Sequence, residues 1–475
     1  MAPPETAPRQ VRLRRCSIWS PTLFLRGVDG PIQSRLSEYG QDISKSVVSL
    51  DIYESIFQNT LSGTVRLKET DGYPEHFPLV GTEYLFVEFA IDYLGHERVF
   101  NREFRIRKLG DQSFPQREER LYTLELVSPE FFKSMSSRMT KRYRGTCVEA
   151  VEDIMKTQLE IDETRLHAVE RTSGTIDVLI PNYTPLQAIN YFTALSLTEA
   201  SPYACNFLFY ETLDGFYFKS IRGILQKYSE GKEVATFQVD ANKVTGAQVI
   251  DEAQAFSSII RIHQEQMFDV LSDVTTGVLR SRMLHLDFFA RQYKEVNSRY
   301  TETFEAFKGD HLDKFPLYPE NFDQSVDKNT KLFTVLSDTS SSESAYRKQN
   351  EGTVSRNRIY ESVVLRNRQL REIQHLRTVL EVPGQPNLRA GTVVILNYPS
   401  TRLIVDAPHN LSAPVSQTPT PFHSGRHLVT NVRHNLVQIS TGVMEYRMHI
   451  EATRDSLGAP LISYAEDTTD VDVVT

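Results

Sequence analysis

A strict alternation of apolar and polar residues near the end of the chain, VMEYRMHIEA at 443–452, constrains the fold more than any other feature. The apolar side chains of this stretch are Met444, Tyr446, Met448 and Ile450. The polar side chains between them are Glu445, Arg447, His449 and Glu451. Because successive side chains of a β-strand point to opposite faces, the stretch predicts a strand with one dry face and one wet face. The chain must therefore contain a sheet that covers the dry face.

The spacing of this strand from its neighbour has a counterpart earlier in the sequence. FRIRKLG starts at Phe104 and YTLELVS at Tyr122, and 122 − 104 = 18. LVTNVRH starts at Leu428 and YRMHIEA at Tyr446, and 446 − 428 = 18. A Leu…Gly turn and an apolar strand precede each pair, in LVGTEYLFVEF and LRAGTVVILNY. We therefore predict two related antiparallel β-barrels; hairpins of equal geometry without duplication are the alternative, since such spacings recur widely.

Between the two predicted barrels the pattern changes to helices and a hairpin. The stretches GTCVEAVEDIMKTQL and NYTPLQAINYFTAL begin with capping boxes, Thr146 with Glu149 and Thr184 with Gln187. Such boxes satisfy free N–H groups at helix starts, so both stretches are predicted to be helices. The dipeptide Asp214-Gly215 between two aromatic-rich runs predicts a two-residue β-hairpin.

The chain of 475 residues is long enough for roughly two to four domains. We predict a mainly β fold with two smaller outer α+β domains. Residues 304–358 are predicted to be irregular, with a low-complexity patch at 337–345, and a Pro/Ser/Thr-rich loop covers 406–425. The predicted division is 11–133 for the first β-barrel, 134–233 for an outer α+β domain, 234–270 with 376–455 for the second β-barrel, 271–375 for an outer inserted domain, and 1–10 and 456–475 for flexible tails.

The charge and the cysteines exclude some classes of protein. A net charge of −8 argues against a dedicated nucleic-acid binder, which usually has a basic excess. The first residues are basic, but no apolar segment follows them, and no run approaches the ~18 apolar residues of a membrane span. We expect a soluble intracellular product. Cys16, Cys147 and Cys205 are widely spaced and are expected to be buried, unreactive thiols.

The motifs that commonly carry chemistry do not occur in the sequence, which has no GxxxxGK[ST], GxGxxG, HExxH or GxSxG. His423 and His427 are four residues apart, with His434 beyond them, but no Cys or Asp ligand pattern accompanies them. We therefore predict no catalytic residue, no cofactor-binding residue and no metal site, and no enzymatic activity.

Two groups of charged residues have structural explanations. Asp287 lies among apolar residues in LHLDFFARQYK, and we expect it to be a buried carboxylate that pairs with Arg291 or Lys294. Glu118 and Glu119, which are flanked by arginines, are expected to form the charged tip of a hairpin.

Several stretches, taken in order along the chain, carry a family resemblance. In order along the chain, these stretches are SVVSLDIYESIFQNTLSGTVRLKETDG, IPNYTPLQAINYFTALS with NFLFYETLDGFYFKSI, GVLRSRMLHLDFFARQYKEVNSRY, and LEVPGQPNLRAGTVVILNYP with HSGRHLVTNVRHNL. Together they resemble the baseplate hub proteins of contractile-tailed bacteriophages, over about residues 45–455. The basic leading arm, the 304–358 segment, the 406–425 insertion and the acidic tail depart from the family pattern.

The resemblance implies a structural protein of the virion tail baseplate that assembles in the host cytoplasm. It implies a homotrimer in which two barrels per chain give six quasi-equivalent positions. Its implied partners are a central spike protein, the tail tube protein (through loops such as 71–77), other baseplate wedge proteins and passing genomic DNA, with no membrane-spanning segment. We also expect the channel lining not to be strongly basic, because a tightly held polyanion would not pass.

Other classes of function make different demands on the sequence. A tail-associated cell-wall hydrolase would need paired carboxylates or a Cys/His pair. A fused hub-spike of type VI secretion would continue into a β-helix, so we expect the spike to be a separate polypeptide, although a hub of a related injection system fits. A carbohydrate-binding module would need stacking platforms, and Trp19 is the single tryptophan.

Overall fold

The computed structural model describes residues 10–20, 40–70, 79–93, 96–116, 119–198, 205–229, 235–238, 256–266, 268–288, 291–319, 322–336, 359–398, 423–440 and 443–459. Several predictions concern residues outside these ranges. These residues are 1–9 and 460–475 of the two predicted tails, the patch at 337–345, residues 406–422 of the 406–425 loop, the loop at 71–77, and positions 117–118 of the hairpin tip.

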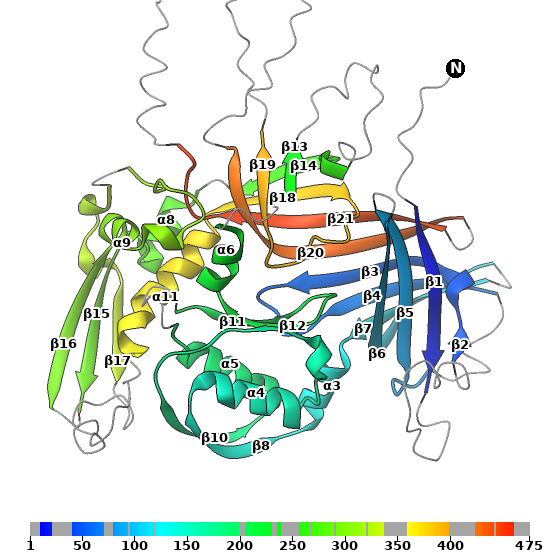
Figure 1. The fold of residues 1–475 in the computed structure, drawn as a ribbon, viewed down its shortest axis with the longest axis horizontal. Helices are drawn as coiled ribbons and strands as arrows, with labels where there is room; N and C mark the ends of the chain where they lie inside the picture. Colours follow the sequence, from blue (N-terminus) through cyan, green and yellow to red (C-terminus); the bar gives the residue numbers. More distant parts are fainter. Residues whose placement is uncertain are drawn as a thin grey trace, which may run out of the picture.

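Eight antiparallel strands form a closed circuit in which each strand pairs with two others (Figure 1). In circuit order they are β3 (Val47–Ser55), β4 (Ser62–Glu69), β7 (Glu119–Val127), β6 (His96–Gln116), β5 (Tyr84–Tyr93), β1 (Gln10–Trp19), β21 (Val443–Arg454) and β20 (Gly425–Ser440). The short β2 (Gln41–Asp42) pairs with β1. We call these eight strands the first ladder.

A second ladder continues from the same two C-terminal strands. Its order is β14 (Arg261–Gln266), β18 (Leu376–Pro383), β21, β20, β19 (Val393–Asn397) and β13 (Ala235–Gln238). Strand β20 pairs with β19 near its start and with β3 further along, so it belongs to both ladders. Strand β21 likewise pairs with β18 and β1. The first ladder thus includes two strands from the range 376–455, and the division into domains stays a prediction.

The alternation of β21 is confirmed. Met444, Tyr446, Met448 and Ile450 are each at most 2% exposed. One apolar core contains residues of both ladders, such as Leu124 from β7 and Leu380 from β18. Because Met444, Tyr446, Met448 and Ile450 point to one side of β21, both ladders have their cores on the same side of the β20–β21 hairpin. The chain is mainly β, as predicted.

The two stretches with equal spacing form equivalent meanders. Strands β5, β6 and β7 pair in that order, and so do β19, β20 and β21. Leu85 lies opposite Phe104 in one meander, and Val393 lies opposite Leu428 in the other. Both meanders follow a glycine with positive φ, which is +90° at Gly81 and +84° at Gly391.

In Figure 1 the α+β region lies below β20, β3 and β4, with β5 and β1 to its right. Both capping boxes are confirmed, at α4 (Cys147–Thr157) and α5 (Pro185–Leu195). The other elements are α3 (Pro129–Ser136), β8 (Met139–Gly145), β9 (Leu166–Val169), β10 (Ile176–Tyr183), β11 (Phe207–Glu211), β12 (Phe216–Ser220) and α6 (Ile221–Ser229).

The hairpin between β11 and β12 is also confirmed, but its turn is one residue earlier than predicted. Thr212 and Gly215 exchange backbone hydrogen bonds of 2.8 and 3.2 Å, so Leu213 and Asp214 are the two loop residues. Gly215 follows the loop with a φ of +152°.

A third unit, on the left in Figure 1, contains a sheet with the order β16-β15-β17. Its elements are α8 (Val270–Thr276), β15 (Arg280–Asp287), β16 (Gln292–Arg299), α9 (Tyr300–Ala306), β17 (Leu332–Leu336) and α11 (Ile359–Ile373). Helix α11 packs on the sheet through Val364 and Met283. The prediction that 304–358 is irregular is wrong at β17, which pairs in parallel with β15.

Candidate functional site

The three histidines near β20 lie in different environments. His427 is fully buried, and its burial together with the charge of Arg454 lowers its pKa to about 3, so its imidazole is neutral. His434 is also buried, seven residues further along β20, and His423 precedes the strand. Among the described residues there is no group of three or more His, Cys, Asp or Glu side chains that could hold a metal ion.

His434 belongs instead to a buried polar junction centred on Glu54 of β3. The Glu54 carboxylate accepts hydrogen bonds from the backbone N–H groups of Leu213, at 2.7 Å, and Ala390, at 2.9 Å. The Nε2 atom of His434 lies 3.1 Å from Glu54 Oε1, and its Nδ1 atom lies 2.7 Å from the Tyr446 hydroxyl. One carboxylate therefore connects β3, the β11–β12 hairpin, the turn before β19, and β20.

Two arginines extend this junction, which we call the Glu54 junction. The Arg389 guanidinium lies 3.2 Å from an Asp214 carboxylate oxygen and 3.8 Å from Glu54, and it stacks over the Phe100 ring of β6 at 4.9 Å. The Arg102 guanidinium of β6 donates to the Leu213 carbonyl. The turn before β19 and the middle strand of the first meander, β6, thus both contact one hairpin of the α+β region.

The electrostatics of the Glu54 junction favour the ionised carboxylate. Burial alone would raise the pKa of Glu54, but the charge and hydrogen bond of His434, the charge of Arg389 and the Ala390 N–H outweigh it. The pKa of Glu54 is therefore lowered from its ordinary value of 4.5. A buried charge that is satisfied on several sides holds its neighbours in place, and loss of one partner is costly.

A second junction joins the first ladder to the α+β region around Glu211 of β11. Glu211 accepts from the Leu61 N–H at 2.9 Å and from the Ser128 hydroxyl. Arg165 lies between Glu211, at 2.6 Å, and Glu130, at 2.5 Å. Burial and the neighbouring Glu130 charge raise the pKa of Glu211 to about 7, although Arg165 opposes the shift. This junction therefore has two buried carboxylates for one guanidinium.

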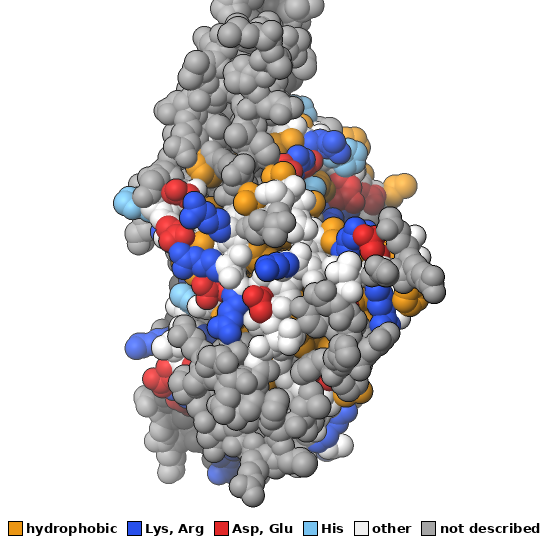
Figure 2. All heavy atoms as spheres, turned by 90° about the vertical axis from the view of Figure 1, so that its right-hand side faces the viewer, with side chains coloured by type: hydrophobic (Ala, Val, Ile, Leu, Met, Phe, Trp, Pro, Cys, Tyr) orange, Lys and Arg blue, Asp and Glu red, His pale blue; other side chains and the backbone are white. Residues whose placement is uncertain are grey.

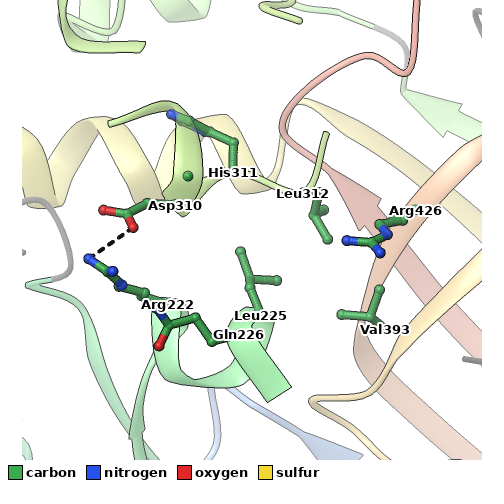
Figure 3. A pocket seen from close by; sticks show the side chains of 9 residues that line it. Arg222, Leu225, Gln226, Asp310, His311, Leu312, Val393 and Arg426 are labelled. Carbon is green, nitrogen blue, oxygen red and sulfur yellow. Dashed lines mark ion pairs between the residues drawn. The ribbon is translucent and has the colours of Figure 1, made fainter. Parts of the chain in front are cut away.

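A third junction fastens the unit on the left of Figure 1 to the second ladder. The Arg454 guanidinium of β21 lies 2.9 Å from the Asp313 carboxylate, and His311 Nδ1 lies 3.0 Å from the Asp455 carboxylate. Figure 3 shows a small hollow beside this junction, with the ion pair of Arg222 and Asp310 on one side. The hollow is lined by Arg222, Leu225, Gln226, Gly309, Asp310, His311, Leu312, Val393 and Arg426.

The wet face of the shared strands carries ion pairs. Arg433 of β20 pairs with Asp51 of β3 at 2.9 Å. Arg447 of β21 lies 2.7 Å from Glu381 and 2.6 Å from Glu445. Around Arg447, an open depression is lined by Glu381, Asn435, Val437, Glu445, Arg447 and His449. Basic and acidic side chains alternate here, so this face presents no single-sign field.

The face of the molecule near β1 and β5 has the same mixed character. Figure 2 shows basic and acidic side chains intermingled on it. Arg14 of β1 lies 2.6 Å from Glu97 and 3.8 Å from Glu88. Arg14, one of the basic residues near the start of the chain, is therefore paired with carboxylates of the strands beside it.

The remaining predicted residues have structural surroundings. The three cysteines are buried and free, as predicted, and burial raises the pKa of Cys147 to about 11. Asp287 is buried at the end of β15, while its pairing with Arg291 or Lys294 stays a prediction. Glu119 pairs with Lys68 at 2.9 Å beside the β6–β7 turn. Trp19 is 4% exposed and stacks on Tyr84, so its ring does not offer an open platform.

Sequence motifs do not reveal the junction residues, because these residues are far apart in the sequence. One local signal was available. Glu54 follows Leu50 and Ile52 on the inward face of β3, and His434 follows Val432 on that of β20. A charged or polar residue in an otherwise apolar strand position must find a partner when it is buried. The pattern identifies Glu54 and His434 as buried polar residues that need partners, but it does not predict that the two side chains contact each other.

No protein-family model and no curated protein matches the sequence. Among solved structures, the chain is similar to the tail protein from Neisseria meningitidis MC58, with a TM-score of 0.48 and 12% identity, over 94% of this chain and 99% of that chain. It is similar to the 43 kDa tail protein of prophage MuSo2 from Shewanella oneidensis, with a TM-score of 0.49 and 8% identity, over 93% and 99% of the two chains.

A third similar structure is a component of the type VI secretion system of E. coli, described as structurally similar to the T4 bacteriophage tail proteins gp27 and gp5. Its TM-score is 0.41 at 9% identity, over 86% of this chain and 73% of that chain. Two of these structures are tail proteins and one is a secretion-system component, and the likeness is one of fold at low identity.

Proposed function

We propose that the chain is a structural hub in the baseplate of a contractile phage tail. Three copies form a ring of six quasi-equivalent positions, which joins a sixfold tail tube to a threefold central spike and lets genomic DNA pass. The barrels at 11–133 and at 234–270 with 376–455 supply these positions. The regions 134–233 and 271–375 face the peripheral baseplate proteins. The hub is assembled in the host cytoplasm and resides in the virion tail.

One observation carries this proposal: β20 and β21 belong to both ladders, and the two ladders have one apolar core. A hub that matches three chains to six tube subunits must hold its two positions per chain at a fixed distance and angle. Hydrogen-bonded strands that run through both positions meet this requirement, whereas a flexible linker would not. The three buried junctions support the same role, because each fastens an outer region to the ladders.

The charge pattern of the wet face supports the passage of DNA. Nucleic acid is held mainly by basic groups that contact its phosphates. Arg433 and Arg447 on this face are already paired with carboxylates. A channel lined by such pairs would exert little hold on a moving polyanion. Among the described residues, none of the helices has the length and apolar character that a membrane crossing requires.

The mass of the purified full-length chain tests the proposal. We expect assemblies with a multiple of three chains, measured by native mass spectrometry and by analytical ultracentrifugation. Addition of the tube protein and the spike protein of the same phage should give complexes with each of them. A chain that stays single in the presence of its spike would contradict the proposal.

A cell-wall hydrolase is the second candidate, and a specific observation weakens it. Glu130 and Glu211, two carboxylates that share Arg165 between packed regions, are buried, so a glycan strand has no access to them. Release of peptidoglycan fragments by the purified chain is the measurement that decides. Reproducible lysis that Glu211→Gln abolishes would favour the hydrolase over the hub.

A further inference from the structure

The sheet of the third unit, β16-β15-β17, has one face that a helix of the same unit covers. Met283 of β15 and Val364 of α11 form one apolar cluster. Partly buried side chains of β16 and β17 pack against this cluster: Val296, Phe333 and Val335. Helix α11 also reaches the main apolar core, through Ile373. It therefore lies between this face of the sheet and the rest of the molecule (Figure 1).

The opposite face of the sheet, which we call the outer face, carries a row of apolar side chains. Leu286 of β15 is the register partner of Tyr293 of β16 and of Leu336 of β17. Because register partners point to the same face, the three side chains form one row across all three strands. Tyr293 is 75% exposed and Leu336 is 60% exposed. Leu284, two residues before Leu286, and Leu332, which is 50% exposed, continue the apolar surface along the strands.

The outer face therefore has the composition of a covered face and the exposure of an open one. Single exposed apolar residues are common on proteins, whereas a contiguous patch on the order of a few hundred Å² marks an interaction site. An apolar sheet face is commonly buried by a helix packed on it, as α11 does on the inner side. Three strands at a spacing of about 4.8 Å are about 10 Å wide, which is the diameter of one helix. The outer face is therefore suited to a single helix.

Charged side chains at the other end of the outer face indicate the kind of helix. Arg282 of β15 lies 2.8 Å from Glu295 of β16. Lys328, before β17, lies 3.7 Å from the same carboxylate. Arg280 donates to the Val326 carbonyl at 3.1 Å. Three basic groups thus accompany one carboxylate, and a helix with acidic side chains would supply the complementary charge.

The positive charge of this region is local. Arg299, at the end of β16, has carboxylates of its own, Glu302 at 2.5 Å and Asp323 at 3.4 Å, so it adds no positive charge to the outer face. The chain as a whole has a net charge of −8. The basic groups beside the apolar row therefore differ from the average surface and favour a partner of opposite charge.

We propose that the outer face of the β16-β15-β17 sheet binds an amphipathic helix of a peripheral baseplate protein. The apolar stripe of that helix covers Leu286, Tyr293 and Leu336, and its acidic side chains lie next to Arg282 and Lys328. The surface and the chemistry of the helix follow from the sheet, whereas the assignment of the helix to a baseplate protein rests on the proposed function. Binding of this kind gives the sheet a helix on each face.

Substitutions on the outer face of the full-length chain test the inference. The probe is the set of wedge proteins of the same phage, purified together, and biolayer interferometry measures its affinity for the immobilised chain. Tyr293→Ser and Leu336→Ser should each weaken binding about tenfold or more, because a few buried anchors dominate the affinity of an interface. Leu179→Ser, at a 60% exposed position of β10, is the matched control and should bind like the wild type. All three variants should melt like the wild type, because the side chains are exposed.

The charge of the outer face is tested in the same way. Lys328→Glu should weaken binding several-fold, because an attractive contact with the acidic helix becomes repulsive. Added salt should weaken binding of the wild type by screening the same contact. Lys156→Glu on α4 is the matched control, since its side chain is similarly exposed and also pairs with a glutamate, Glu163.

Several outcomes overturn the inference. One is equal affinity of the wild type, Tyr293→Ser and Leu336→Ser, and another is no binding of the wedge proteins to the wild type. Vesicles of phosphatidylcholine and phosphatidylglycerol that the wild type binds and these two variants do not would assign the outer face to a lipid surface instead. A self-association of the wild type that both variants lose would assign it to a second copy of the chain.

Native mass spectrometry of the same samples, alone and with the tube and spike proteins, tests the proposed function separately. A threefold hub that binds the wedge proteins equally well in the wild type and in the outer-face variants contradicts the inference alone. A single chain that still binds the wedge proteins through the outer face contradicts the hub alone.

Discussion

The meanders β5–β6–β7 and β19–β20–β21 have the same strand order and similar registers but differ in reach. The far end of β6 extends beyond β5 into solvent, where Phe114 is 70% exposed. The corresponding length of β20 pairs with β3 instead, and β21 pairs with β1. Equal hairpin spacing therefore gives two equivalent meanders. The first meander belongs to the first ladder alone, whereas strands β20 and β21 of the second meander belong to both ladders because of their additional partners, β3 and β1.

The registers of the two meanders also diverge along the strands. Ile106 lies opposite Leu126 in the first meander, and Val432 lies opposite Ile450 in the second. The two meanders are offset by 428 − 104 = 324 residues, so the equivalents of Ile106 and Leu126 are Thr430 and Ile450. Ile450 lies opposite Val432 instead of Thr430, which is a displacement of two residues. Both strand pairs contain β-bulges, which add residues to one strand of a pair. Duplication and independent hairpins of equal spacing both remain compatible with this difference.

The largest expected effect comes from the junction between the two meanders. Glu54→Ala leaves His434 and Arg389 without their buried carboxylate and should lower the free energy of unfolding by about 3–5 kcal/mol. Urea unfolding followed by circular dichroism measures the change. Glu445→Ala, on the wet face of β21, is the matched control and should cost about 1 kcal/mol or less. Equal effects of the two substitutions would show that the Glu54 junction does not hold the meanders together.

Core substitutions test whether the two ladders unfold as one body. Leu124→Ala in the first ladder and Leu380→Ala in the second each remove a fully buried side chain and should cost about 2–5 kcal/mol. Because both side chains belong to one apolar core, each substitution should displace the same unfolding transition. Calorimetry and tryptophan fluorescence, which reports on Trp19 in the first ladder, would follow it. Two transitions that respond separately to the two substitutions would contradict a shared core.

The equivalent glycines before the two meanders offer a sharper comparison. Both have positive φ, so alanine at either position carries a backbone cost of about 1 kcal/mol. A Cβ atom at Gly391 would lie 2.5 Å from the Tyr210 hydroxyl, whereas no atom of the described residues lies within 4 Å of one at Gly81. Gly391→Ala should therefore lower the melting temperature more than Gly81→Ala. The opposite order would mean that the turn before β19 is not packed against Tyr210.

The smallest expected effect is a pH dependence that distinguishes the two buried carboxylate junctions. The pKa of Glu211 is raised from 4.5 to about 7, so the native state binds more protons between these values and its stability should fall as pH rises from about 4.5 to 7. The pKa of Glu54 is lowered, so the stability from Glu54 is present above pH 4.5 and is lost only as pH falls through the lowered value.

Glu130→Gln separates the contribution of Glu211 from the rest. This substitution removes the neighbouring negative charge that helps to raise the pKa of Glu211, so the decline in stability between about pH 4.5 and 7 should become shallower by about 1 kcal/mol. Melting temperatures of wild type and variant across this pH range provide the measurement. Parallel curves for the two proteins would exclude Glu130 as a cause of the Glu211 shift.

Features encoded locally in the sequence were predictable, and features that depend on distant partners were not. The capping boxes at Thr146 and Thr184 and the alternation of β21 each depend on residues within one short stretch, and the structure confirms all three. The closure of the first ladder depends on pairings such as that of Val11 with Met444, which no local pattern specifies. The Glu54 junction is of the same kind, because its members come from four separate segments.

Strand β17 was missed for a related physical reason. Its five residues are half exposed, and Leu332 and Leu336 point to solvent while Phe333 and Val335 pack beneath. Such a short strand has little pattern of its own and is stabilised by its parallel neighbour β15. The turn before β12 lies one residue earlier than predicted. The glycine that marks the turn, Gly215, follows the two loop residues and is not one of them.

The two-sided pairing of β20 has a mechanical consequence. A pull along the length of this strand loads its bonds to β3, β19 and β21 in shear, so many backbone hydrogen bonds must break together before the strand slides. The far end of β6, which among the described strands pairs with β7 alone, can be peeled away one bond at a time. Force that enters the molecule through β20 therefore meets a stiff member, and force that enters through the tip of β6 meets a compliant one.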